Sequence, residues 1–115
     1  MSLASKLQIK PDQKVRLVNA PPGFELDAPT TRAGSAPAVL VFVRNAKELE
    51  SKAAPALEAA REDRLAWIAY PKAGQLDTDL NRDILWKLLD GKGVKPVRQV
   101  AIDEVWSALR FRPAE

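Results

Sequence analysis

Polar side chains that could hold an anion follow the expected buried strands. Arg44 comes directly after the apolar run 38–43, and Lys72 follows the run 65–70. Because ligands of open α/β sheets lie beyond the carboxyl ends of the strands, we expect these cations to converge with the start of the next helix. The predicted site, for a small anionic or nucleotide-like ligand, contains Arg44, Lys72, Asp79, Asn81 and Arg82. The sequence favours the alternative that acidic residues satisfy the helix end while the two cations are solvated.

Two carboxylates, Asp79 and Asp83, stand four residues apart and would share one face of a helix. Oxygen ligands of this kind suit a hard cation such as Mg²⁺. The favoured interpretation is structural, with Asp79 as a helix cap and Asp83 paired with Arg82 or Lys87. We therefore predict no metal site.

The most distinctive polar cluster lies near the end of the chain, at Asp103, Trp106, Ser107 and Arg110. One interpretation is an interaction surface on a hairpin. The favoured one is structural, with Asp103 capping a turn, Trp106 packed and Arg110 in an ion pair. Trp86 and Trp106 could stack on nucleic-acid bases, but packing is the more common use of tryptophan in a core of this size.

Histidine and cysteine are both absent from the chain. An imidazole base, a thiol nucleophile, a Ser-His-Asp triad, a disulfide and a Cys/His zinc site are therefore excluded. The side chains that remain for acid–base or nucleophilic work are Asp, Glu, Lys, Tyr, Ser and Thr. We assign no catalytic residues and no cofactor, and an enzyme is the less favoured class.

The formal charge of +3 is small for 115 residues. Basic residues gather at the two ends of the chain, at Lys6, Lys10, Lys14, Arg16, Arg98, Arg110 and Arg112. Elsewhere they alternate with acidic residues, whereas a nucleic-acid binder usually concentrates its charge on one face. Nucleic-acid binding is therefore the weakest of the three functions considered.

One domain, residues 1–115, is expected from the length. No apolar run approaches the 18 residues of a membrane span, and the first residues lack the apolar segment of a secretory signal. We expect a cytoplasmic protein with no membrane partner.

Strands and helices alternate along the chain. Expected strands are 14–19, 38–43, 65–70, 97–102 and 105–112, and the last two form a hairpin around Asp103-Glu104. Asn45 begins a helix that Pro55 interrupts and that ends near residue 61. A second helix has N-cap candidates at Asp77, Thr78 and Asp79 and ends at Gly91 and Gly93. This order predicts an α/β fold, with a small, mostly parallel sheet of about five strands and a C-terminal antiparallel hairpin.

Right-handed crossovers would place both helices on one face of that sheet. Strands 38–43 and 65–70 are nevertheless apolar on both faces. The second face is covered either by segments 1–13 and 20–37 or by another chain. We expect a homodimer through this face or through the edge of the first strand.

The element order resembles a Rossmann-like class I methyltransferase core that keeps its first strand and its second half. Segments along nearly the whole chain resemble a bacterial family of short proteins of unknown function with this reduced fold: "KLQIKPDQKV", "VLVFVRN", "AYPKAG", "DLNRDILW" and "VRQVAIDEVWSALRFRP". The resemblance implies a fold and no catalytic residues.

The turn after the first strand, "NAPPGF", departs from true methyltransferases, which carry a Gly-x-Gly-type turn there. Prolines offer no N–H group, and their rings block a close approach. S-adenosylmethionine is therefore not expected as a cofactor. The sequence favours a non-catalytic, oligomeric binding or regulatory module, and the alternative is a ligand-binding protein or enzyme that uses the crevice at the strand ends.

Overall fold

The computed structural model of the protein describes residues 3–72, 74–76 and 78–114. Its elements are, in chain order, α1 (Leu3–Lys6), β1 (Val15–Val18), β2 (Ala38–Phe42), α2 (Ala46–Lys52), α3 (Ala54–Arg61), β3 (Leu65–Pro71), α4 (Arg82–Leu89), β4 (Val94–Ala101) and β5 (Trp106–Pro113).

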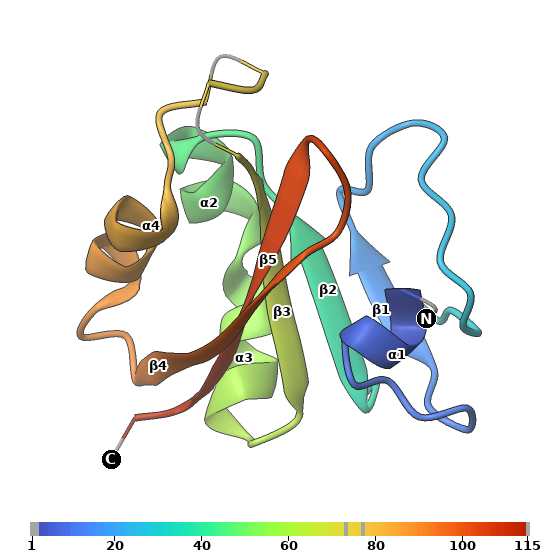
Figure 1. The fold of residues 1–115 in the computed structure, drawn as a ribbon. Helices are drawn as coiled ribbons and strands as arrows, with labels where there is room; N and C mark the ends of the chain where they lie inside the picture. Colours follow the sequence, from blue (N-terminus) through green and yellow to red (C-terminus); the bar gives the residue numbers. More distant parts are fainter. Residues whose placement is uncertain (1–2, 73, 77, 115) are drawn as a thin grey trace.

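The strands form one mixed sheet in the order β1-β2-β3-β5-β4 (Figure 1). β1, β2 and β3 are parallel, whereas β5 is antiparallel to both β3 and β4. The expected α/β class, with a parallel first half and an antiparallel C-terminal hairpin, is confirmed. The last strand inserts between β3 and β4, so β4 and not β5 forms the edge.

Several element ends differ from the predictions, and three of the differences have a structural reason. β1 stops at Val18 because Asn19 takes a left-handed conformation with φ 60°. β4 begins three residues before the expected Val97, because an edge strand tolerates Pro96 beside a register shift. The N-cap of α4 is Asn81, whose side chain accepts from the Ile84 N–H at 2.9 Å, and none of the three predicted residues; of these, Asp77 lies outside the described residues.

The predicted interruption at Pro55 is confirmed. α2 ends at Lys52 and α3 begins at Ala54, with proline in the first turn of α3 where its missing N–H costs nothing. Asn45 caps α2 as expected, because its side chain accepts from the Glu48 N–H at 2.9 Å.

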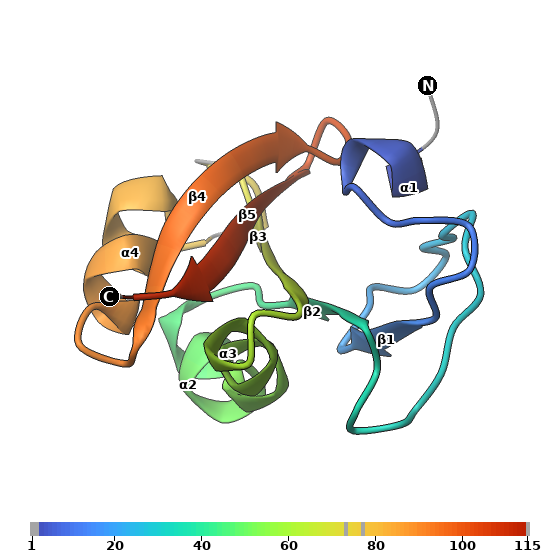
Figure 2. The same cartoon turned by 90° about the horizontal axis from the view of Figure 1, so that it is seen from below.

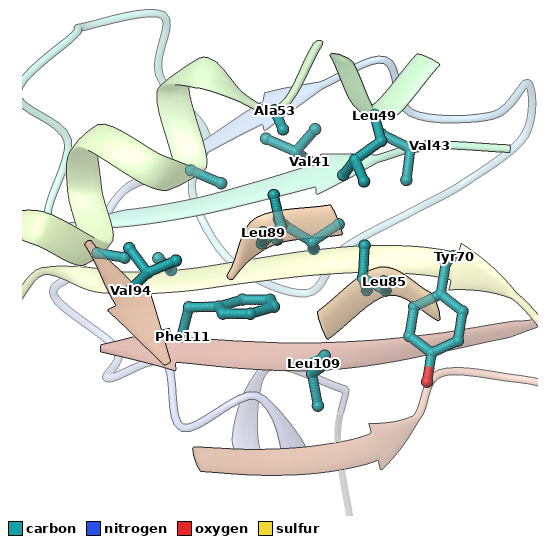
Figure 3. Close-up of a cluster of buried hydrophobic side chains, with 14 of the residues drawn as sticks. Val41, Val43, Leu49, Ala53, Tyr70, Leu85, Leu89, Val94, Leu109 and Phe111 are labelled. Carbon is teal, nitrogen blue, oxygen red and sulfur yellow. The ribbon is translucent and has the colours of Figure 1, made fainter. Parts of the chain in front are cut away.

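α2, α3 and α4 cover one face of the sheet, as the crossover rule predicted (Figure 2). The core on this side joins β2, β3 and β5 to the helices. Figure 3 shows its larger side chains, among them Val41, Leu85, Leu89, Leu109 and Phe111. The ring of Tyr70 lies in the same core, and burial raises the pKa of its hydroxyl.

The opposite face is covered by the chain itself. Leu7 and Ile9 from the N-terminal segment and Phe24 and Leu26 from the long connection pack on the outer side of β2 and β3. The indole N–H of Trp67 donates to the Leu7 carbonyl at 2.9 Å, which fixes the segment on the sheet. Of the two alternatives for this face, the structure shows the intramolecular one.

The second sheet face was the main reason to expect a homodimer, and over β2 and β3 the chain covers this face itself. The β1 edge is partly occupied as well, since the Val15 N–H donates to the Pro29 carbonyl at 2.8 Å and the Thr31 N–H donates to the Val15 carbonyl at 2.9 Å. Among the described residues, no helix is both long and apolar enough to cross a membrane.

Candidate functional site

A hollow of about 440 Å³ lies at the carboxyl edge of the sheet, where α/β domains bind their ligands. The turn after β1, the residue after the β2 apolar run, the loop after β3 and the start of β5 each contribute to its walls. The lining residues are Asn19, Ala20, Pro21, Pro22, Arg44, Leu76, Val105 and Trp106. Among the described residues that line it, Arg44 alone has an ionisable side chain.

Asn19 fixes the turn that forms one wall of the hollow. Its left-handed backbone turns the chain sharply after β1. Its side-chain amide donates to the Phe42 carbonyl at 2.9 Å and to Glu48 Oε1 at 3.1 Å. The turn is thereby tied to the end of β2 and the first turn of α2.

Glu48 connects three elements at this edge. Its Oε1 also accepts from the Arg44 N–H at 2.8 Å, and its Oε2 accepts from Arg44 Nε at 3.1 Å and Nη2 at 2.8 Å. The Arg44 side chain holds the pKa of Glu48 below its ordinary value, and Glu48 in turn raises the pKa of Arg44. The cation at the rim of the hollow is thus already engaged by a carboxylate.

The turn after β1 does not fit an adenosyl cofactor. Pro21 and Pro22 have no N–H, and the Phe24 N–H donates to the Pro21 carbonyl at 3.1 Å. The Phe24 ring packs edge-on against Phe42 with centroids 4.7 Å apart. No carboxylate that could hold a ribose occurs among the described lining residues. This geometry agrees with the expectation that the cofactor is not bound in the usual mode.

Each of the five residues of the predicted anion site has a recorded contact within the fold. Arg44 is bound to Glu48, and Asn81 caps α4. Asp79 Oδ1 accepts from the Ala46 N–H at 2.9 Å, so it satisfies the N-terminus of α2 and not that of its own helix. Arg82 pairs with Asp83 at 3.5 Å, and both side chains are largely exposed. Lys72 donates its backbone N–H to the Val105 carbonyl at 2.7 Å, at the back of the hollow.

The geometry of Asp79 and Asp83 differs from the prediction. Asp79 precedes α4, so the two carboxylates do not share a helical face. No cluster of three or more carboxylates suited to a metal ion occurs in the described part of the chain. Asp83 does pair with Arg82, one of its two expected partners.

Asp103, Trp106 and Ser107 of the hairpin cluster all have structural contacts or burial in the fold. Asp103 Oδ1 accepts from the N–H groups of Val105 and Trp106, both at 2.8 Å, and so caps the turn as predicted. Trp106 is 6% exposed and packs against Phe42, and Ser107 is buried in β5. Arg110 differs from the prediction: within the described residues its recorded partner is Gln8 Oε1 at 2.7 Å, not a carboxylate.

Trp86 also differs from its predicted packing role. It is 50% exposed on α4, because the buried stripe of that short helix consists of Leu85 and Leu89.

Three residues of the hollow's architecture were missed by sequence reasoning. Leu76 and Val105 line it, and Glu48 fixes two of its walls. Glu48 stands three residues after Asn45, which is the spacing of a capping box. Its hydrogen bond to Asn19 joins residues 29 apart, and no local sequence pattern predicts such a bond. Leu76 has φ 52°, a conformation that nothing in the sequence indicates.

No protein-family model matches the chain, and no curated protein matches it significantly.

Proposed function

We propose that the protein is a non-catalytic binding module of reduced methyltransferase-like fold, which takes a planar, mostly apolar group into the hollow at the carboxyl edge. The observation that carries the proposal is the lining. Proline rings, Leu76, Val105 and the edge of Trp106 form its walls, and the one described ionisable residue, Arg44, is engaged by Glu48. Such a lining can bind, but its described residues offer no group placed to transfer a proton or attack a substrate.

The sheet supports the fold part of this proposal. Three parallel strands are followed by a last strand that inserts antiparallel between β3 and β4. The element order thus agrees with a core reduced to its first strand and second half. In this proposal the cofactor is not bound, because the turn after β1 contains two prolines and Arg44 is already held by Glu48.

Among the described lining residues, Leu76 has the properties expected of a ligand contact. It is 53% exposed and has a left-handed backbone, which is uncommon for a bulky residue and costs about 1 kcal/mol or more. An exposed apolar side chain in a strained position contributes little to folding. We therefore assign it to ligand contact.

The test is a titration of the ¹⁵N-labelled protein with indole, a planar apolar probe. We expect the amide signals of Asn19, Ala20, Leu76 and Val105 to shift in a saturable way. The variant Leu76→Gly should weaken this response several-fold, whereas Leu88→Ala, which removes a comparably exposed leucine from α4, should leave it unchanged. No saturable response at these amides, or equal loss in both variants, would refute the proposal.

A further inference from the structure

The fold brings Lys6, from the basic N-terminal segment, beside the basic C-terminal hairpin. Lys6 Nζ donates to the Ala101 carbonyl at the end of β4, at 3.3 Å, and Gln8 Oε1 accepts from Arg110 Nη1 at 2.7 Å. These contacts join residues 95 and 102 positions apart. Figure 2 shows α1, which carries Lys6, beside the end of β4, on the side of the β4–β5 hairpin that faces away from α2 and α3.

Register places the C-terminal cations in two cross-strand pairs. Arg98 of β4 is opposite Arg110 of β5, and Lys95 is opposite Arg112. Directly opposed side chains share a face of the sheet at about 5 Å, and residues two apart along a strand are separated by roughly 7 Å. Arg110 is also opposite Trp67 of β3, which places the row on the face opposite the helices. We call Lys6, Lys95, Arg98, Arg110 and Arg112 the basic surface.

Charge is concentrated on this basic surface. Within the described residues, the carboxylate recorded in a salt bridge with it is Asp63, which holds Arg112 at 3.0 Å. Within the described part of the chain, no salt bridge is recorded for the other four cations of this surface. The fold therefore gathers positive charge on one side, a feature that the sequence alone did not show.

Folding gains little from this arrangement. Burial lowers the pKa of Arg110, and the nearby charges of Arg112 and Arg98 lower it further. Arg110 Nε is buried, and no hydrogen-bond partner is recorded for it. Such a group opposes folding, and its replacement by an apolar side chain is often neutral or stabilising. A bound anion would reduce the repulsion between Arg110 and the neighbouring Arg98 and Arg112. The row of cations is therefore better explained by binding of an anion than by a contribution to folding stability.

We propose that the basic surface binds the sugar–phosphate backbone of nucleic acid without reading its bases. The row runs from Lys95 to the end of β4, roughly 20 Å of strand, which suits a chain of phosphates better than a single small anion. The two tryptophans on this face, Trp67 and Trp106, are 1% and 6% exposed, so neither offers an open ring for a base to stack on. Duplex, with its higher charge density, should therefore bind more tightly than a single strand.

The test is fluorescence anisotropy of a labelled 20-base-pair DNA duplex with the full chain, at 50 and 200 mM salt. Four to five phosphate contacts predict that affinity falls about 150- to 500-fold across this range. A second duplex of unrelated sequence should bind equally well, and the single strand more weakly. Absence of binding at 50 mM salt, or a tighter single strand, would overturn the proposal.

Two double variants distinguish an effect of the basic surface from an effect of the protein's net charge. The double variant Arg98→Gln/Arg110→Gln should remain folded, lose at least tenfold in affinity and show a shallower salt dependence. The matched control Lys47→Gln/Lys52→Gln removes the same charge from exposed positions of α2 and should bind nearly as well as the parent. Equal loss in both variants would contradict a defined surface. If polyglutamate bound as tightly as the DNA duplex, the proposal of nucleic acid would be overturned and the partner would be an acidic protein.

Discussion

At the scale of single residues, Glu48 determines how the carboxyl edge is built. It accepts from the Asn19 side chain, from the Arg44 N–H and from the Arg44 guanidinium, and its side chain is 19% exposed. One carboxylate thus holds the turn after β1, the end of β2 and the start of α2 in one arrangement. Its ionisation should matter for stability more than that of an exposed glutamate.

We predict that Glu48 contributes to the acid sensitivity of the protein. Its pKa is lowered in the folded state, mainly by the Arg44 side chain, so its stabilising effect is present above the ordinary glutamate pKa and is lost as pH falls through the folded value. Glu48→Gln should unfold more easily at pH 7, by about 1 kcal/mol, and lose less stability on acidification below pH 5.

The measurement is urea unfolding between pH 3 and pH 7, with Glu50→Gln on the same helix as the matched control. Parallel stability curves for the parent and Glu48→Gln would contradict this role.

Leu76 gives a second prediction at the residue scale. Because Leu76→Gly relieves a left-handed backbone and removes little buried surface, the variant should be as stable as the parent, or more stable by up to about 1 kcal/mol. Thermal unfolding measures this. A clear loss of stability would show that Leu76 supports the fold and not a ligand.

At the scale of elements, the N-terminal segment acts as the missing second layer. Leu7 is fully buried, Ile9 is 7% exposed, and the Ala4 N–H donates to Asp27 Oδ1 at 2.9 Å, which joins the two covering segments. Neither segment forms a long helix or a strand of the sheet, yet both pack on β2 and β3.

We predict that Leu7→Ala destabilises the protein by about 2–5 kcal/mol, a large share of what a domain of this size has. Thermal unfolding and binding of a hydrophobic dye would report the opened face. Lys10→Ala, at an exposed position of the same segment, serves as control. A Leu7→Ala variant as stable as the parent would mean that the segment is not part of the core.

Periodicity and breaker residues were sufficient to predict every strand, the split helix at Pro55 and the hairpin. They failed where a contact joins distant residues. Asn81, and not the predicted Asp79, is the N-cap of α4. The carboxylate of Asp79 instead accepts from the Ala46 N–H at the start of α2, 33 residues away. Topology predicts a ligand site at the carboxyl edge, and a hollow lies there. Its lining depends on the left-handed backbone of Leu76 and Asn19, which no sequence pattern indicated.

At the scale of the whole molecule, both faces of the sheet are covered over β2 and β3, and the β4 edge is a poor template for a further strand. β4 carries Lys95, Pro96 and a register shift before Arg98, features that discourage strand addition. We therefore expect a monomer at tens of micromolar, contrary to the dimer that the bare sheet suggested. Sedimentation velocity should give the mass of one chain, and a dimer would show that a further surface is apolar enough to associate.

We propose that the fold keeps the ligand edge of a methyltransferase-like sheet without its cofactor site. The most direct test compares the affinities of adenosine and S-adenosylhomocysteine by ¹⁵N titration. The account predicts equal affinities within about threefold, because the proline turn offers nothing to the amino-acid tail of the cofactor product. Binding of S-adenosylhomocysteine tenfold tighter than adenosine, with shifts at Asn19 and Ala20, would show that the cofactor site persists and would contradict the account.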